Sequence, residues 1–240
     1  LSGEDHLDFL HRMTTNHCLD LVPGTTVEVV FPDNRGRIIA YASCHHLKGG
    51  TSLVVSETRG ATELTSWLKR YHFAERMEIA SEDDSTAMIE LIGPDASRVA
   101  ATVGIPIGAA SDGGQLPGEF DGNVVLIRRD QFANLGLRAA GPARALGTLW
   151  RQLRAAGCQP AGEEAFDTVR IEAGNPGDRE LTPDFNPWEA GLSRAVHMNK
   201  GCYIGQEVIA RLDTYDKVKQ HLVGLAIDGD DIPEPGTRLN

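Results

Sequence analysis

The sequence has few of the features that mark specialised classes of protein. Its 240 residues include four cysteines, and the two nearest in sequence, Cys18 and Cys44, lie 26 positions apart. No CxxC pair is therefore available for a structural zinc site. A chain of this length does not need disulfides, so we expect reduced thiols in a cytoplasmic protein. No apolar run approaches the roughly 20 residues of a membrane span, and the acidic start LSGEDHLD is unlike a secretion signal.

Motifs of several common enzyme classes are also missing. The sequence has no GxGxxG after a strand, no GxxxxGK[ST], no GxSxG and no HExxH, so nucleotide-binding folds and serine hydrolases have no support. Basic residues are scarce, with 23 Lys and Arg against 34 Asp and Glu, and the net charge is −11. Because phosphate neutralisation supplies most non-specific affinity for nucleic acids, we expect no strong direct nucleic-acid binding.

Histidines and cysteines are adjacent at two places, His17-Cys18 and Cys44-His45-His46. Consecutive residues of a strand point to opposite faces, so only one histidine of the second group could face a shared metal ion. We therefore predict no metal site.

The spacing of apolar residues predicts short strands mixed with amphipathic helices. Strands are expected at 25–31, 37–44, 52–56, 87–92, 124–129 and 135–140, and helices at 4–16, 64–71, 146–153 and 163–173. The turn residues PDNRG join the first two strands into a hairpin. Antiparallel hairpins placed irregularly among helices indicate an α+β fold and not a doubly wound parallel sheet.

Two changes of composition indicate domain boundaries. Residues 104–122 are rich in Gly, Pro and Ala, which is typical of a loop and marks an internal boundary. The run KQHLVGLAI at 219–227 predicts a strand that opens a further unit. We therefore expect one α+β region over 1–217 and the start of a second, truncated domain over 218–240, with residues missing at both termini.

The run KGCYIGQE is the most informative stretch of the sequence. Gly201 and Gly205 flank Cys202, which favours a tight turn before a helix that begins near Gln206. The neighbouring cation Lys200 and the helix N-terminus both favour a thiolate, which is the nucleophilic form of cysteine. We therefore predict a functional thiol. The alternative is a buried structural cysteine in a glycine turn.

A second candidate site lies in the run RIEAG. The carboxylate of Glu172, near a helix end and beside Gly174, can accept paired N–H donors from a flat heterocycle. Trp188, Tyr203 and Phe185 lie on nearby segments and could supply a surface on which such a ring stacks. The alternative is that Glu172 is a solvated helix residue.

These motifs together resemble a known family. RIEAG, followed by PWEAGL and KGCYIGQEVIARL, makes the chain similar to the YgfZ branch of the folate-binding YgfZ/GcvT family. The runs FLHRMTTNHCLDLVPG, NRGRIIAY and MIELIGPDA match the same family in the same order, so the resemblance covers essentially the whole chain. The residues that match its KGC[FY]xGQE signature include Gly201, Gly205, Gln206 and Glu207.

The resemblance implies two related, partly discontinuous α+β domains around a central tetrahydrofolate pocket, followed by a C-terminal β-barrel that would begin near Val218. It also implies an accessory role in the maturation or repair of iron–sulfur proteins, including enzymes that modify tRNA. The implied partners are folate and iron–sulfur client or assembly proteins. Cys202 matches the functional thiol of the family, with Lys200 as its neighbouring cation. Glu172 matches the carboxylate that binds the pterin, and Glu189 matches a second motif acid.

The sequence departs from the aminomethyltransferases of the wider family. Their hairpin reads GGIIDD, where this chain has Ala40 and Tyr41 in place of the acidic pair, and their GYTGEDGFE run is replaced by RDQFANLG. Without a carboxylate from the acidic pair, no obvious group can accept or donate the proton during methylene transfer. This absence disfavours aminomethyl transfer. The alternatives to an accessory protein are a folate-dependent aminomethyltransferase or demethylase with an unusual catalytic group, and a binding module that uses no folate.

Overall fold

The computed structural model describes residues 1–58, 61–82, 86–116, 124–130, 132–229, 233–234 and 236–238. Its strands are β1 (Ser2–Gly3), β2 (Thr25–Pro32), β3 (Ile38–His46), β4 (Ser52–Ser56), β5 (Met77–Glu78), β6 (Thr86–Leu91), β7 (Val125–Arg128) and β8 (Leu137–Pro142). Its helices are α1 (His6–Met13), α2 (Ala61–Lys69), α3 (Ala96–Thr102), α4 (Ala143–Ala155), α5 (Glu163–Glu172) and α6 (Gln206–Thr214), with short turns of 3-10 helix at η1 (Ile107–Ala109) and η2 (Ser193–Ala195).

The first sheet has the antiparallel order β2-β3-β4, and its two faces are built from alternate residues. Phe31, Ala42 and Cys44 point to one face, where they form an apolar core with residues of α1 and α2 such as Phe9 and Leu68. The side chains between them point to the opposite face. The alternation therefore gives the sheet one face covered by helices and a second face. On the second face Val30 and Ile38 pack against Leu181, Ala190 and Leu192 of the returning chain, and the rest can form a site.

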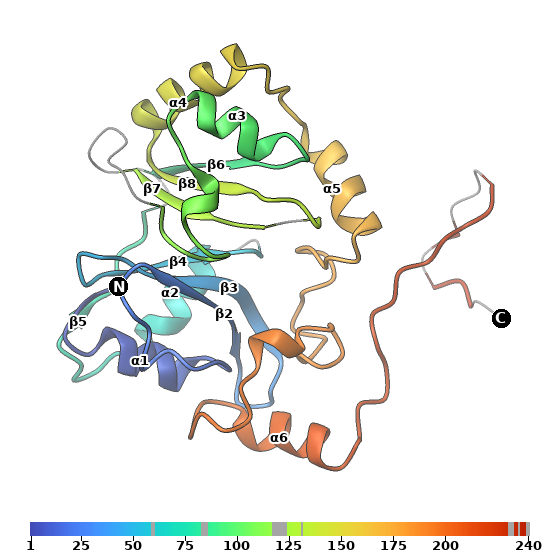
Figure 1. The fold of residues 1–240 in the computed structure, drawn as a ribbon. Coiled ribbons are helices and arrows are strands. Elements are labelled where there is room, and N and C mark those ends of the chain that lie inside the picture. The colour runs from blue at the N-terminus through green and yellow to red at the C-terminus, as the bar shows by residue number, and fades with distance from the viewer. Residues whose placement is uncertain are drawn as a thin grey trace.

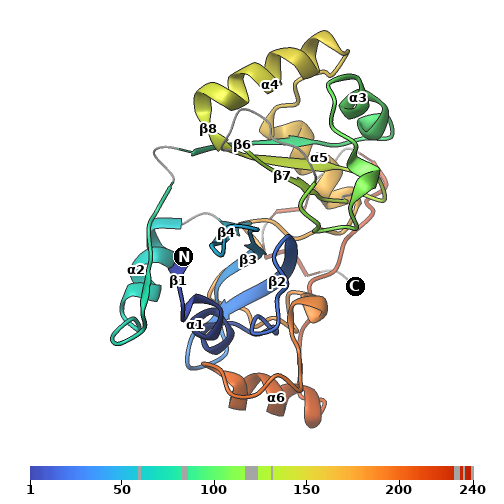
Figure 2. The same cartoon turned by 60° about the vertical axis from the view of Figure 1, so that its left-hand side comes forward.

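The second sheet has the antiparallel order β6-β8-β7 and carries α3 and α4 on one side. Leu146, Leu149 and Leu153 recur on one stripe of α4 and are buried against Leu126 and Leu137 of the sheet. Figures 1 and 2 show α3 and α4 above the second sheet and the first sheet beneath it, with α1 low on the first sheet and α2 beside it in Figure 2. The two sheets therefore face each other between the helices.

After α5 the chain returns to the first sheet and attaches to the residues that follow α1. The Thr15 hydroxyl donates to the Ala195 carbonyl at 2.6 Å, and the His197 amide donates to the Thr15 carbonyl at 2.9 Å. The Asn16 side-chain amide donates to the carbonyl of Arg194 at 3.1 Å. The first sheet is therefore completed by a segment almost 180 residues later in the sequence.

Helix α6 begins where the chain crosses the β2–β3 turn. Gly205 precedes the helix with φ of 76°, and a Cβ at this position would lie 2.3 Å from the Asp33 carbonyl oxygen. Gly36 faces it from the turn, where an added Cβ would lie 3.0 Å from Ile209. Both glycines hold a left-handed conformation, with φ of 73° at Gly36, and Gly205 is also required by its close approach to the backbone of the turn.

Most of the predicted elements are confirmed. The six predicted strands and the helices after residues 4, 64, 146 and 163 all form within a few residues of the expected positions, as does the helix after Gly205. Residues 104–116 form the predicted loop, which contains η1 and lies between α3 and β7 of the second unit, while 117–122 lie outside the described residues. The internal boundary expected there stays a prediction.

The strand predicted at 219–227 is wrong. The described residues after α6 form no helix or strand and extend away from the sheets (Figure 1). Leu222, Val223, Leu225 and Ile227 are all exposed there. The backbone of the segment pairs with no strand of the described chain, and the Leu222 amide instead donates to the Glu189 carbonyl. A strand needs a neighbour for its backbone groups, so β-type residues alone do not produce one.

We expect Gly205→Ala to lower the free energy of unfolding by about 3 kcal/mol, because the new Cβ collides with the Asp33 carbonyl and the residue must also hold a positive φ. Chemical denaturation would measure the loss. Gly104→Ala is the matched control, since Gly104 has φ of 81° but nothing within 4 Å of the added Cβ, and should cost about 1 kcal/mol. Equal losses in both variants would show that the close approach at Gly205 does not determine the loss of stability.

Candidate functional site

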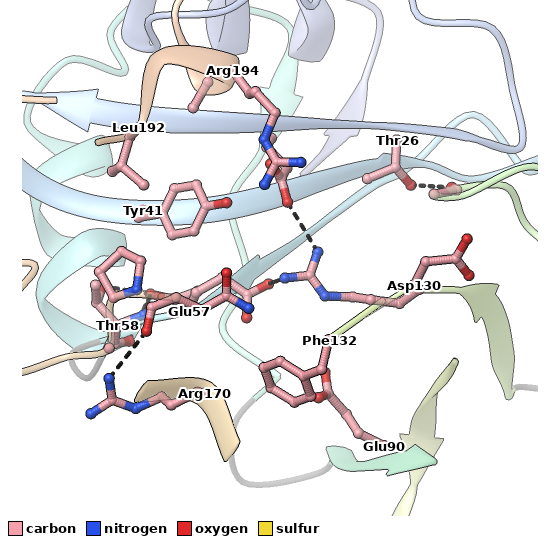
Figure 3. A pocket seen from close by; sticks show the side chains of 18 of the residues that line it. Thr26, Tyr41, Glu57, Thr58, Glu90, Asp130, Phe132, Arg170, Leu192 and Arg194 are labelled. Atoms are coloured by element: carbon pink, nitrogen blue, oxygen red, sulfur yellow. Dashed lines mark hydrogen bonds and ion pairs between the residues drawn. The ribbon is translucent and has the colours of Figure 1, made fainter. Parts of the chain in front are cut away.

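A cleft of about 770 Å³ lies between the two sheets. Its walls are the outward face of β2 and β3, the end of β4, β7 with the loop that follows it, α5, and the returning chain at 174–178 and 191–195. Figure 3 shows Tyr41, Leu192 and Arg194 on one side and Phe132, Glu90 and Arg170 on the other. The volume is in the range of clefts that bind cofactor-sized molecules.

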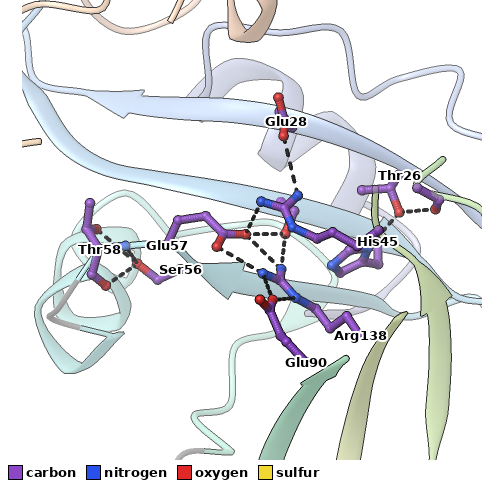
Figure 4. Close-up of polar contacts among 11 residues, drawn as sticks. Thr26, Glu28, His45, Ser56, Glu57, Thr58, Glu90 and Arg138 are labelled. Carbon is purple, nitrogen blue, oxygen red and sulfur yellow. Dashed lines mark hydrogen bonds and ion pairs between the residues drawn. The ribbon is translucent and has the colours of Figure 1, made fainter. Parts of the chain in front are cut away.

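The floor of the cleft is built around Arg138 of β8, which is only 1% exposed. Its guanidinium binds both carboxylate oxygens of Glu57, at 2.7 and 2.9 Å, and donates to Glu90 at 2.7 Å and to the Ser43 hydroxyl at 2.9 Å (Figure 4). Glu90 is the direct cross-strand neighbour of Arg138, whereas Glu57 and Ser43 belong to the first sheet and its extension. The guanidinium therefore joins the two sheets.

Arg129 extends this network towards the opening. Its guanidinium lies 3.3 Å from a Glu28 oxygen and 3.2 Å from a Glu57 oxygen. Burial raises the pKa of the Glu57 carboxyl, but its hydrogen bond from Arg138 and the charges of Arg138 and Arg129 outweigh burial and leave the pKa below its usual value. Glu57 is therefore ionised at neutral pH and holds two arginines in place.

His45 of β3 is a neutral histidine in the wall of the cleft. The Thr26 hydroxyl donates its one proton to the Gly113 carbonyl, so His45 Nδ1 must donate to Thr26 Oγ1, 2.6 Å away. Burial and the charges of Arg138 and Arg129 lower the pKa of His45 to about 3. Nε2 then carries a lone pair, and it has no hydrogen-bond partner among the described residues.

Positions 40 and 41, where the sequence lacks the expected acidic pair, point in opposite directions. Ala40 is buried in the core against α1 and α2, whereas Tyr41 lines the cleft. Only position 41 could therefore act on a molecule in the cleft. Burial and the nearby negative charge of Glu28 raise the pKa of the Tyr41 phenol, so Tyr41 is protonated and can donate a hydrogen bond.

Two aromatic rings meet at the cleft across different segments. Phe132, in the loop after β7, contacts Phe166 of α5 edge to face, with ring centroids 5.9 Å apart. Phe132 and Ala133 both have positive φ, 52° and 59°, which is uncommon for residues other than glycine. The backbone of this loop is therefore strained where it places the Phe132 ring against the cleft.

Helix α5 presents one face to the cleft, and Glu172 is not on it. Glu163, Phe166, Asp167 and Arg170 line the cleft at the spacing of a single helical face. Glu172 follows Arg170 by roughly 200° around the helix, is exposed and is absent from the lining. Its predicted contact with a pterin stays a prediction.

The buried member of the RIEAG motif is its arginine. Arg170 donates to Asp167 at 2.7 Å and lies 3.1 Å from Glu180, and it is packed against Gly177. A Cβ on Gly177 would lie 2.5 Å from the guanidinium carbon, so the glycine leaves room for the arginine. Arg170 thus fixes the end of α5 to the loop that follows it.

Lys200 and Cys202 point to different surroundings. The Lys200 ammonium is buried and donates to the carbonyls of His11 and Thr14, and it lies 4.9 Å from the centre of the Tyr203 ring. Burial lowers its pKa to about 8, against the opposing influence of Cys18 and Cys44. Cys202 is exposed on the surface and is not part of the cleft lining. The alternative of a buried structural cysteine is therefore wrong.

The other predicted ligand-binding side chains also make structural contacts outside the cleft. The Trp188 indole donates to the Ile209 carbonyl at 2.9 Å and so holds α6. Glu189 accepts from the Asn186 amide at 3.0 Å and lies 3.2 Å from Arg37. Neither Trp188 nor Glu189 lines the cleft, nor does Tyr203. Their predicted binding of a cofactor stays a prediction.

The remaining motif residues shape the turn. Gly201 has φ of 96° and lies close to His11. The Gln206 amide donates to the Tyr203 carbonyl, and Glu207 is exposed on α6, 3.8 Å from Arg211. The segment around Cys202 is attached to α1 by the Ile204 amide, which donates to the Arg12 carbonyl at 3.2 Å, and by the hydrogen bond between the His11 ring and the Lys200 carbonyl.

All four cysteines are free thiols. Among the described residues, no group of three or more His, Cys, Asp or Glu side chains is placed to hold a metal ion. His45 and His46 lie on opposite faces of β3, as the alternation predicted: His45 in the cleft wall and His46 against His6. In the described part of the chain, no helix is long and apolar enough to cross a membrane.

The ionic floor of the cleft was missed by the sequence analysis. Its signal was an arginine inside the apolar strand run LGLRAA, because a charge in such a run is buried and requires carboxylate partners. The sequence could not indicate those partners, since Glu57 and Glu90 come from two different sheets.

Comparison with known proteins finds one matching family model and several similar sequences. Residues 1–200 match the family model described as the GCVT N-terminal domain. A chloroplastic protein of Arabidopsis thaliana, described as a putative transferase, is 34% identical over 255 positions that cover 100% of this chain and 56% of that protein. An aminomethyltransferase of Moorella thermoacetica is 30% identical over 246 positions, covering 98% of this chain and 66% of the enzyme. The chain thus spans between about half and two thirds of these relatives.

A solved structure has the same fold. The glycine cleavage system aminomethyltransferase T from Bartonella henselae matches with a TM-score of 0.78 at 22% identity, over 89% of this chain and 60% of that one. This likeness confirms the expected fold of the aminomethyltransferase type. The YgfZ branch within that fold stays a prediction.

We expect Glu57→Gln to lower the free energy of unfolding at pH 7 by about 3 kcal/mol, because it leaves Arg138 and Arg129 without their shared carboxylate. The folded-state pKa of Glu57 is depressed, so its contribution is present above the unfolded value of about 4.3 and is lost as the pH falls through the folded-state value. Denaturation curves of both proteins should therefore converge in acid. Glu207→Gln, on exposed α6, is the control that should stay within about 0.5 kcal/mol. A constant difference at every pH would contradict the ionic role of Glu57.

Proposed function

Because the chain belongs to the GCVT N-terminal domain family, we propose that it binds a reduced folate in the cleft between its two sheets. The observation that carries the proposal is the cleft itself, whose 770 Å³ are lined by carboxylates, a protonated Tyr41 and the rings of Phe132 and Phe166. A reduced pterin is a flat ring rich in N–H groups. Carboxylates accept hydrogen bonds from these groups, and aromatic side chains stack against the ring. Tetrahydrofolate or a derivative is therefore the proposed cofactor.

We further propose that the folate-bound protein assists the maturation or repair of iron–sulfur proteins, and through them tRNA modification. Cys202 supports this role because it is an exposed thiol on a turn fixed at both ends, by Lys200 to α1 and by Gly205 to the hairpin. An exposed thiol outside the cleft is available to a partner protein without displacing the folate. Iron–sulfur client or assembly proteins are the proposed partners.

Aminomethyl transfer is the second candidate, and one observation favours it. Glu28 of β2 lines the cleft, and its cross-strand partner Ser43 is two residues from Tyr41 on β3. Residues 28, 41 and 43 share one face of the sheet, so a carboxylate from β2 lies beside the position where β3 lacks one. Glu28 would then manage the proton during transfer.

Two further features belong to this proposal. We propose that the two sheets are the centres of two related domains, since each is a three-stranded antiparallel sheet with helices on its outer face. We also propose that 218–240 begin a C-terminal domain, a role that the exposed apolar side chains of this segment support. The free thiols support a reducing compartment such as the cytoplasm.

Titration with tetrahydrofolate, under reducing and anaerobic conditions, tests the binding site. We expect saturable heat on mixing and an affinity about three- to tenfold weaker in Phe132→Ala, because the ring at the cleft is lost. Phe73→Ala removes a ring that is 85% exposed and outside the cleft, so it should bind as the unchanged protein does. No saturable heat with the unchanged protein would contradict the proposal.

Rescue of an iron–sulfur enzyme tests the thiol. In cells that lack their own copy of such a protein, the full-length gene should restore the enzyme's activity and Cys202→Ala should not, because the alanine has no thiol. Cys158→Ala, at a half-buried cysteine outside the motif, is the control that should rescue fully. Equal rescue by Cys202→Ala at equal protein levels would rule out a functional role for the thiol. Release of methylene-tetrahydrofolate from an amine donor would favour the second candidate.

A further inference from the structure

The arginines that line the cleft are ion-paired, with one exception. Carboxylates outnumber arginines in the lining, and the arginines there are Arg128, Arg129, Arg170 and Arg194. Arg128 binds Asp130, Arg129 binds Glu28 and Glu57, and Arg170 binds Asp167 and Glu180. In the part of the chain that the structure describes, Arg194 is the cleft arginine whose guanidinium has no ion pair.

The position of Arg194 is fixed although its side chain is exposed. The residue lies in η2, and its carbonyl accepts a hydrogen bond from Asn16 at 3.1 Å. The next carbonyl, of Ala195, accepts from Thr15 at 2.6 Å. Figure 3 shows the Arg194 side chain extending into the cleft on the side where Tyr41 and Leu192 lie. A rigid backbone therefore holds an uncompensated cation at the edge of the cleft.

An anionic group of a ligand has few places to bind in such a cleft. Acidic side chains from both sheets and from α5 line the rest of it, including Glu28, Glu57 and Asp167. A ligand carboxylate near those groups would be repelled. At Arg194 it would instead find a guanidinium whose N–H donors bind no residue that the structure describes and which suits planar carboxylates.

We infer that Arg194 is the subsite for the carboxylate tail of the ligand. For the reduced folate of the proposed function, on which this inference rests, the tail is the glutamate attached to the benzoyl ring. The pterin ring then lies away from Arg194, among the carboxylates that accept its N–H groups. Arg194 thereby fixes which end of the molecule faces the rim of the cleft and selects folates over pterins that lack a tail.

The test compares tetrahydrofolate with 6-methyltetrahydropterin, which has the same ring system and no glutamate. Both are titrated into the unchanged protein, Arg194→Gln and Arg35→Gln. Arg35 is an exposed arginine of the β2–β3 turn that does not line the cleft, so its variant controls for the loss of one positive charge. We expect Arg194→Gln to bind tetrahydrofolate about tenfold more weakly. Its affinity for the pterin should be unchanged, and Arg35→Gln should match the unchanged protein with both compounds.

Salt gives a second readout that does not depend on the pterin. Tetrahydrofolate binding to the unchanged protein should weaken as salt screens the Arg194 pair, and Arg194→Gln should lose that sensitivity. Equal tetrahydrofolate affinity in Arg194→Gln, an equal loss for both compounds, or an unchanged salt dependence would each overturn the inference while leaving folate binding intact. An unchanged protein that binds neither compound would overturn the proposed function, and the inference with it.

Discussion

A guanidinium buried between two sheets needs carboxylates from both of them, and Arg138 obtains one from each. Glu90 faces it across the second sheet, and Glu57 reaches it from the end of the first, with Ser43 completing its hydrogen bonds. Because a buried charge without partners is very unfavourable, this cluster restricts how the sheets can be placed relative to each other. The cleft, the pairing of Arg129 and the neutral state of His45 all depend on that placement.

The parts of the fold that depend on neighbours in sequence could be predicted, and the parts that depend on distant partners could not. The spacing of apolar residues predicted the strands and helices, and the alternation of residues along a strand predicted that His45 and His46 lie on opposite faces. The strand expected at 219–227 did not form because side-chain type does not supply a neighbouring strand. The resemblance implied a central pocket, but its ionic floor could not be predicted because that floor joins residues 43, 57, 90 and 138.

The KGCYIGQE motif has two roles: some of its residues build a turn, and Cys202 is exposed on that turn. Lys200, Gly201 and Gly205 hold one turn against α1 and the hairpin, through carbonyl hydrogen bonds and close backbone contacts. Their effect is to keep Cys202 at the surface on a segment with few conformations. A motif of this kind is recognised in sequence by its spacing, but only the structure separates the residues that build the turn from the residue that the turn displays.

The attachment of the returning chain to Thr15 and Asn16 also sets the order in which the protein can be completed during synthesis. The second sheet and its helices are contained in residues 86–155 and can form as soon as that stretch has left the ribosome. The first sheet is made earlier, yet its face opposite α1 and α2 remains uncovered until residues 181–195 and α6 have been made. At typical rates of translation, the time between the synthesis of β4 and that of residues 181–195 is on the order of ten seconds. The half of the protein that is made first is therefore the half that is finished last, and its open sheet is the surface that needs protection from aggregation in the meantime.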